Sequence, residues 1–149
     1  MKSLLTILLL AATAQAADID VIAYTIYTEA RGESYKGKRA VASVIVNAAT
    51  QKRRTLAQEC LKPYRYEGMK HVRNTGEVPQ WFVDARISAL PDLTARSVSY
   101  YLAGMMLRGD FESVGPWNMF YSGSEPYWSK MMSDSCVIGE HTFGYLENL

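Results

Sequence analysis

A glutamate at the end of an apolar helical segment has the clearest catalytic potential in this sequence. Glu29 lies in residues 27–33 (YTEARGE), after apolar residues that recur at helical spacing. Packing against the core and the negative end of the helix dipole would both raise the pKa of its carboxyl. A carboxylic acid that keeps its proton near neutral pH can protonate the leaving oxygen of a glycosidic bond. Glu29 is therefore the candidate acid, although many helices end in a solvated glutamate.

Two helices are expected to position this glutamate. The first covers residues 18–29, with Asp18 or Asp20 as its N-cap and Gly32 as its stop. The second covers residues 35–52 without an interrupting proline. Its apolar residues recur on one face, which predicts close packing against the first helix. That face consists of Ala40, Val41, Val44, Ile45 and Ala48.

The middle of the chain gives weaker helical signals. Residues 55–79 are rich in proline, glycine and tyrosine and predict a long surface loop after a short helical turn. A helix is expected over residues 80–90. Another begins near Asp92 or Thr94 and stops by Gly109.

The last third of the sequence changes character. Residues 117–121 and 137–145 are rich in aromatic and β-branched types and predict short strands or a small hairpin, with an aromatic loop at residues 125–128 between them. The fold class expected is α+β, mostly α, in a single domain with a small C-terminal β-hairpin.

The N-terminus has the pattern of a secretory signal peptide. Lys2 supplies a positive charge, residues 4–12 form an apolar run, and residues 14–16 (AQA) form a small-x-small cleavage site. The run is shorter than the roughly 20 residues of a membrane span. We therefore expect residues 1–16 to be a signal peptide cleaved near Ala16, and residues 17–149 to be a secreted or periplasmic domain without stable membrane insertion. A retained anchor is the alternative.

Charge and cysteine content narrow the classes of partner. The formal net charge is +1, whereas a polyanion-binding protein carries a clear basic excess, so nucleic acid is not expected as a partner. The basic run at residues 52–54 suits a helix C-terminus. Cys60 and Cys136, the only cysteines, are expected to pair as one disulfide outside the cytoplasm, or else to be two buried free thiols. No metal or cofactor is expected.

Several segments, in this order along the chain, resemble the SleB-type cell-wall hydrolases. The EARGE run at residues 29–33 and the helix after it are fairly specific to that family, and the later segments support the match. The segments are residues 29–33, 37–47, 60–64, 120–121 and 138–143 (IGEHTF). The resemblance implies a lysozyme-like fold that cleaves peptidoglycan glycan strands between N-acetylmuramic acid and N-acetylglucosamine, commonly as a lytic transglycosylase, and it maps the catalytic glutamate onto Glu29.

The implied mechanism uses one glutamate twice. Glu29 would protonate the glycosidic oxygen and then, as carboxylate, accept the proton of the muramic acid 6-hydroxyl, giving a 1,6-anhydro product without a second carboxylate. The alternatives are a hydrolytic muramidase with Glu67 as second carboxylate, an N-acetylmuramoyl-L-alanine amidase, and a non-catalytic peptidoglycan-binding protein. His71 and His141 are too few for the three ligands of a zinc amidase. A monomer is expected.

Further residues have possible roles in binding or structure. Tyr121, Trp128, Tyr66 and His141 are candidate substrate-binding residues; for Tyr121 and Trp128 the alternative is a core aromatic, and for His141 a structural histidine. Glu33 is expected to be a first-turn partner of the second helix, and Arg31 could pair with either carboxylate. The sequence departs from the family pattern at residues 65–67 (RYE), at Ser122 and after Asn47, which predicts altered groove contacts.

Overall fold

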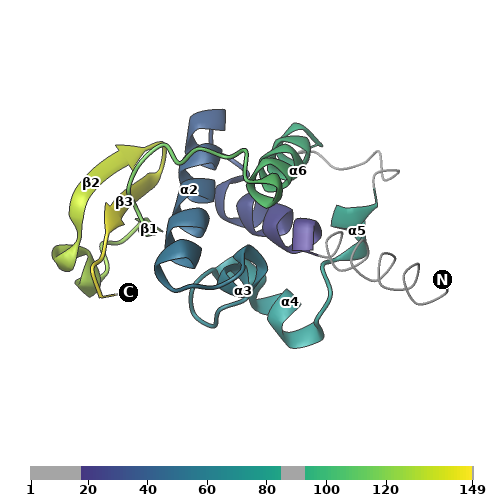
Figure 1. Ribbon diagram of the computed structural model, residues 1–149, viewed down its shortest axis with the longest axis horizontal. Helices are drawn as coiled ribbons and strands as arrows, with labels where there is room; N and C mark the ends of the chain where they lie inside the picture. The colour runs from purple at the N-terminus through teal and green to yellow at the C-terminus, as the bar shows by residue number, and fades with distance from the viewer. Residues whose placement is uncertain (1–17, 85–92, 149) are drawn as a thin grey trace.

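A helical body packs against a small sheet in the computed structural model, which describes residues 18–84 and 93–148 (Figure 1). Residues 18–30 are helical and form the first helix, as predicted. Signal-peptide residues 1–16 lie outside the described residues, so their assignment stays a prediction. Within the described ranges, no helix has the length and apolar character that a membrane crossing requires.

The central element is helix α2 (Tyr35–Gln51), which contacts α3, α6 and the sheet. Its N-cap is Ser34, whose hydroxyl accepts a hydrogen bond from the Gly37 N–H at 3.3 Å. The predicted apolar stripe is confirmed, because all five of its residues are fully buried. The helix therefore forms the scaffold on which the first helix and the sheet are placed.

Short helices occupy the segment that was expected to be a loop. They are the 3-10 helix η1 (Glu67–Met69) and α4 (Lys70–Thr75). Helix α3 (Leu56–Cys60) matches the predicted short helical turn, and α5 (Gln80–Val83) is the start of the helix predicted over residues 80–90. Thr55 and Gln58 form a reciprocal capping box at the start of α3. The loop prediction is wrong at η1 and α4, which are too short to show a periodic pattern and pack against the core through buried Met69 and Val72. Residues 85–90 of the helix predicted over residues 80–90 lie outside the described residues.

Helix α6 (Leu93–Arg108) packs against α2 and ends before Gly109, as predicted. Gly109 has a φ of 76°, the left-handed conformation common after a helix. The Tyr100 hydroxyl donates a hydrogen bond to Asp20 Oδ1 at 2.7 Å and so links α6 to the first helix. Of the two proposed caps, Thr94 lies inside the helix and Asp92 lies outside the described residues.

Three antiparallel strands form the sheet in the order β1-β3-β2. They are β1 (Met119–Ser122), β2 (Ser133–Ile138) and β3 (His141–Tyr145). The predicted strands at residues 117–121 and 137–145 correspond to β1 and β3, which pair with each other. The second segment contains a turn before His141, and its first residues belong to β2, which pairs with the other side of β3. The mostly helical α+β fold class is therefore confirmed.

Two asparagines fasten the sheet to α2. Asn47 donates hydrogen bonds to the carbonyls of Gly115 and Trp117 at 2.9 and 2.7 Å, just before β1 begins. Asn118, which is 1% exposed, donates to Gln51 Oε1 at 2.6 Å. These contacts fix the position of β1 relative to the helical body.

Candidate active site

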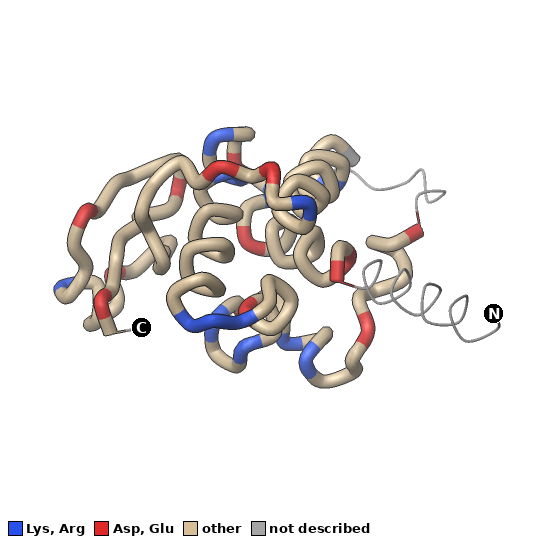
Figure 2. The backbone as a smooth tube through the Cα atoms, in the orientation of Figure 1, with Lys and Arg blue, Asp and Glu red and all other residues tan. Residues whose placement is uncertain are grey.

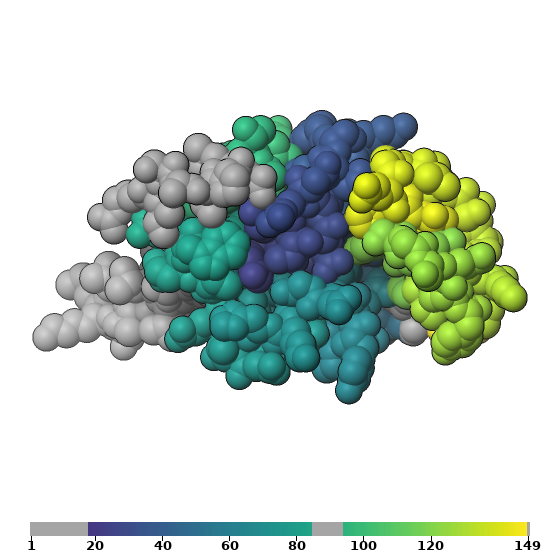
Figure 3. Space-filling view, turned by 180° about the vertical axis from the view of Figure 1, so that it is seen from behind, coloured from purple at the N-terminus to yellow at the C-terminus, as the bar shows by residue number. Residues whose placement is uncertain are grey.

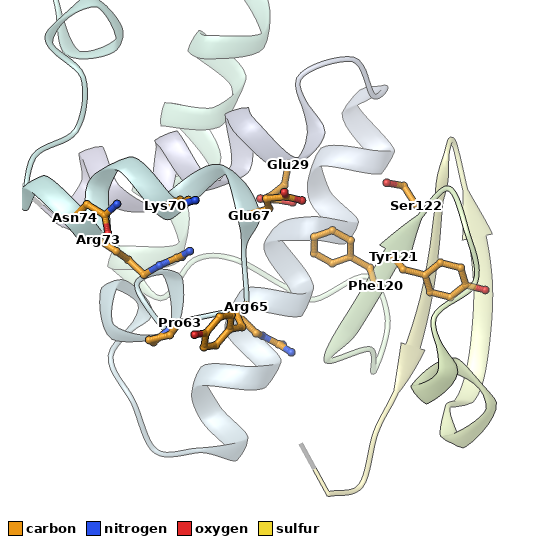
Figure 4. Close-up of a pocket in the computed structure, with 11 residues that line it drawn as sticks. Glu29, Pro63, Arg65, Glu67, Lys70, Arg73, Asn74, Phe120, Tyr121 and Ser122 are labelled. Carbon is orange, nitrogen blue, oxygen red and sulfur yellow. The ribbon is translucent and has the colours of Figure 1, made fainter.

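Glu29 lies at the centre of an open groove between α4 and strand β1 (Figure 4). The groove has a volume of about 770 Å³. Glu29 is half-buried in the last turn of the first helix, and its Oε1 accepts a hydrogen bond from the Gly68 N–H at 3.1 Å. From behind, the first helix is visible between the teal helices and the yellow-green sheet (Figure 3). The first helix thus presents its final carboxyl group to a cleft bounded by two other parts of the fold.

The surroundings of Glu29 favour its protonated form. Desolvation by burial is the largest effect and raises its pKa, and the nearby charge of Glu67 raises it further. The Gly68 N–H and the charges of His141 and Arg73 act in the opposite direction, but the net shift is upward. Burial, the effect expected from the sequence, is therefore the main cause of the shift.

Glu33 joins the turn after the first helix to the turn between β2 and β3. Its Oε1 accepts a hydrogen bond from the Glu140 N–H at 2.8 Å and lies 2.9 Å from His141 Nδ1. Gly139 has a φ of 60°, and a Cβ atom there would lie 1.7 Å from Glu33 Oε2. Glu33 lies beside Gly37 in the first turn of α2, as expected of a first-turn partner, but Ser34 caps that helix and the Glu33 carboxylate binds the hairpin.

The walls of the groove come from the segment before α4 and from strand β1. Arg65 is held in the first wall by its ion pair with buried Glu59, with Nε 2.7 Å from Oε1. Its guanidinium also donates to the Asn118 carbonyl and contacts Met119 Sδ, and so it joins this wall to β1. The other lining residues are Pro63, Tyr64, Glu67, Lys70, Arg73, Asn74, Phe120, Tyr121 and Ser122.

Two solved structures have a fold similar to that of this protein. The catalytic domain of the Bacillus cereus SleB protein matches with a TM-score of 0.56 and 22% identity, over 87% of this chain and 90% of that one. The catalytic domain of the germination-specific lytic transglycosylase SleB from Bacillus anthracis matches with the same TM-score and identity, over 86% and 93%. The chain has the fold of the SleB catalytic domain. No family sequence model and no curated protein matches it.

The likeness to SleB shown by these structures agrees with the fold expected from residues 29–33 and the segments after them. The structure also places the departures from the family pattern. Arg65, Glu67 and Ser122 all line the groove. The other departures, Tyr66 and Ala48, are buried in the core. Three of the five differences therefore lie at the groove.

The four predicted substrate-binding residues do not all reach the groove. Tyr121 lines it. Trp128 packs edge-on against Tyr121 with ring centroids 5.8 Å apart and supports that ring from outside the groove lining. His141 is 7% exposed and packs against Phe120 while its Nδ1 faces Glu33. His141 therefore contacts Phe120, which lines the groove, and Glu33, which fixes the turn after the first helix.

Tyr66 is in the core, and its predicted contact with substrate is wrong. The residue is 1% exposed, and its hydroxyl lies 3.5 Å from Glu59 Oε1. Burial raises the pKa of that hydroxyl well above its usual value. Its neighbours Arg65 and Glu67 line the groove while Tyr66 points into the protein, because the backbone reaches η1 in an extended conformation at this residue.

The predicted disulfide between Cys60 and Cys136 is wrong. Both thiols are free: Cys60 is fully buried in α3, whereas Cys136 is exposed on β2. Burial raises the pKa of Cys60 to about 12. Arg31, considered as a partner for Glu29 or Glu33, has its guanidinium 6.0 Å from the centre of the Tyr27 ring. In residues 18–84 and 93–148, no three His, Cys, Asp or Glu side chains gather as a metal-binding group.

Several groove residues were missed by sequence analysis. Lys70, Arg73 and Asn74 come from α4, where the spacing i, i+3, i+4 places them on one face. That spacing places the three side chains together only if the segment is a helix, and the sequence predicts a loop there. Tyr64 has a φ of 62° and a fully exposed side chain at the groove. In the sequence, the preceding Pro63 was the signal for a turn at Tyr64.

Proposed function

We propose that this protein cleaves peptidoglycan glycan strands between N-acetylmuramic acid and N-acetylglucosamine, with Glu29 as the catalytic residue. The observation that carries the proposal is a half-buried carboxyl group, with a raised pKa, in the middle of an open groove. A fold shared with a protein described as a lytic transglycosylase supports it further. An open groove suits a long polymer because the chain can extend beyond both ends.

The favoured reaction is an intramolecular transfer. Glu29 donates its proton to the glycosidic oxygen while the bond from that oxygen to the muramic acid C1 breaks. The resulting carboxylate accepts the proton of the 6-hydroxyl while O6 forms a bond to C1. The products are a 1,6-anhydromuramic end and a free hydroxyl on the leaving sugar, and Glu29 is protonated again. No water molecule is consumed.

Hydrolysis is the second candidate because Glu67 lies in the same groove. Figure 4 draws the carboxyl groups of Glu29 and Glu67 close to each other, and the charge of Glu67 raises the pKa of Glu29. A carboxylate beside the catalytic acid can orient and deprotonate water for attack on C1. In that reaction Glu67 would be the base, and the product would carry an ordinary reducing end.

Product analysis separates these reactions. Purified peptidoglycan is digested with the protein and with Glu29→Gln, and the soluble products are identified by mass spectrometry. We expect anhydro-muropeptides from the unaltered protein and a loss of at least about 100-fold in rate from the variant. Glu112→Gln, an exposed change outside the groove lining, is the matched control. Unchanged activity of Glu29→Gln would remove Glu29 from its proposed role.

A muramidase, an amidase and a non-catalytic wall protein would each give a different result in the same digestion. Reducing-end saccharides would support the muramidase, and free stem peptides would support the amidase. Binding without any product would support the non-catalytic wall protein. Each of these outcomes contradicts the transglycosylase.

We also propose that the protein acts outside the cytoplasm. The proposal depends on the signal-peptide pattern of residues 1–16. N-terminal sequencing of protein recovered from the medium or periplasm should give a chain that begins at residue 17. Protein recovered only from the cytoplasm with residues 1–16 attached would contradict it.

A further inference from the structure

One flank of the groove is cationic. Lys70, Arg73 and Asn74 extend from α4 on the side opposite the sheet, with Glu29 and Glu67 between the two flanks (Figure 4). Two cations and an amide on one face of one short helix are groups that can donate hydrogen bonds to an anion. The first question is whether these charges already have partners inside the protein.

Neither cation forms an ion pair within residues 18–84 and 93–148. Lys70 is exposed. Arg73 donates from one guanidinium nitrogen to the Tyr66 carbonyl at 2.9 Å, a neutral acceptor that fixes the side chain without neutralising it. Arg65 provides the contrast, because its charge is matched by buried Glu59. Lys70 and Arg73 therefore present charge to whatever occupies the groove.

The positive potential extends beyond the groove along the same side of the molecule. Figure 2 shows Lys and Arg concentrated from the end of α2 through α3 and α4. The pKa of Lys62 is lowered by burial and by the neighbouring charges of Arg54, Arg65 and Lys52. Buried Glu59 pairs with Arg54 and Arg65, whereas Lys62, Lys70 and Arg73 form no ion pair within the described residues, so this side keeps an excess of positive charge although the protein as a whole has a net charge of only +1. Such an excess attracts and orients an anionic ligand.

We propose that Lys70 and Arg73 bind the free carboxylates of the stem peptide attached to muramic acid. The inference depends on the proposed function and specifies its substrate class as glycan that still carries its peptides. The sugars of a peptide-bearing strand are uncharged because their amines are acetylated and the lactyl carboxyl is joined to the peptide. The negative charges of the strand are therefore the carboxylates of the peptide. That peptide leaves the sugar sideways from the lactyl group of the muramic acid whose bond is cut. Cations on the groove wall beside Glu29 suit a group that branches from the strand at the cleavage point.

Binding of soluble glycan strands tests this directly. Two sets of uncrosslinked, fluorescently labelled strands are prepared with acetylated peptide amines: one keeps its carboxylates, and the other has them converted to amides. Dissociation constants are measured by anisotropy with Glu29→Gln, which should bind without cutting. We expect the carboxylate strands to bind about threefold to tenfold more tightly than the amidated strands, with the difference shrinking as salt rises.

Changes at Lys70 assign the preference to this flank. All these changes are made in the Glu29→Gln background. Lys70→Arg should keep the preference for carboxylate strands over amidated strands, Lys70→Gln should reduce that preference about threefold, and Lys70→Glu should reduce it further. Lys36→Gln, an exposed change on α2 outside the groove lining, should leave it unchanged. Equal binding of the two strand sets, or a preference unaffected by Lys70→Glu, would overturn the inference.

The proposed function is judged by a separate measurement. If the unaltered protein cut neither strand set but Glu29→Gln still bound the carboxylate set more tightly, the reaction would be wrong and the carboxylate site would stand. If the unaltered protein cut both strand sets and Glu29→Gln bound them with equal affinity, the proposed reaction would stand and the carboxylate site would be wrong.

Discussion

The carboxylate of Glu33 lies 2.9 Å from His141 Nδ1, although the two residues are 108 positions apart in the chain. The same oxygen, Oε1, also accepts a hydrogen bond from the Glu140 N–H. Lys38 Nζ holds the other side of the turn through the carbonyls of Arg31 and Glu33. The turn that follows the proposed catalytic residue is therefore fixed to both α2 and the sheet.

This arrangement predicts a large cost for a side chain at Gly139. Gly139→Ala places a Cβ atom against the Glu33 carboxylate and requires alanine to adopt a φ of 60°. We expect it to lower the free energy of unfolding by roughly 2–4 kcal/mol and to reduce activity by moving the hairpin away from the first helix. Chemical denaturation and the peptidoglycan digestion measure the two effects.

Gly76→Ala is the matched control for the backbone cost alone. Gly76 has a φ of 76°, but a Cβ atom there would meet nothing within 4 Å, so we expect a loss of roughly 1–2 kcal/mol. Shortening Glu33 to alanine should also make the Gly139→Ala change less costly, because the clashing atoms are gone. Equal costs at Gly139 and Gly76, or additive effects with Glu33→Ala, would contradict contact between Gly139 and Glu33.

The pH dependence of activity should depend on Glu67. Activity requires protonated Glu29, so kcat/KM should fall as pH rises through the raised pKa of that carboxyl. The negative charge of Glu67 contributes to the raised pKa, and Glu67→Gln removes it. The pKa of Glu29 then falls, and the alkaline limb of the pH profile should move to lower pH.

Glu77→Gln is the control for this measurement, since Glu77 is exposed and lies outside the groove lining. Its profile should match that of the unaltered protein. A limb that stays in place or moves to higher pH in Glu67→Gln would contradict the electrostatic coupling. Loss of activity at every pH with an unmoved limb would instead favour Glu67 as the base of a hydrolytic reaction.

Long helices could be predicted from the sequence, whereas the short helix α4 in the groove wall could not. Helix α2 has a complete apolar stripe over Tyr35–Gln51, so periodicity alone identified it and its buried face. Helix α4 has six residues and one buried side chain, Val72, which is too little for a periodic signal. Its cations therefore went unnoticed as a group, although each residue was visible.

The site itself was predictable to the extent that it is local. Glu29 could be selected because it ends an apolar helix, and burial is the largest cause of its raised pKa. The hydrogen bond from the Glu140 N–H to Glu33 could not be predicted, because it joins two turns that only the complete fold brings together. The pairing of Cys60 with Cys136 was predicted by counting cysteines, which contains no information about which face of α3 or β2 carries the sulfur.

Thiol titration tests the placement of the cysteines. Exposed Cys136 should react with a chromogenic disulfide reagent in the native protein, whereas Cys60, whose pKa burial raises to about 12, should react only after unfolding. Cys136→Ser should abolish the native reaction and leave the midpoint of denaturation unchanged. Two unreactive thiols and an intact mass lower by two hydrogen atoms would show instead that the disulfide forms.

Tyr64 should contribute to glycan binding at a cost in backbone strain. Its φ of 62° is unfavourable for any residue except glycine, and its side chain is fully exposed at the groove, where an aromatic ring can stack on a sugar. We expect Tyr64→Gly to weaken strand binding about threefold while raising the free energy of unfolding by up to about 1 kcal/mol. Tyr127→Ala removes an equally polar, 84% exposed ring outside the groove lining and should leave binding unchanged. Equal effects of the two substitutions on binding would mean that the Tyr64 ring has no part in holding the strand.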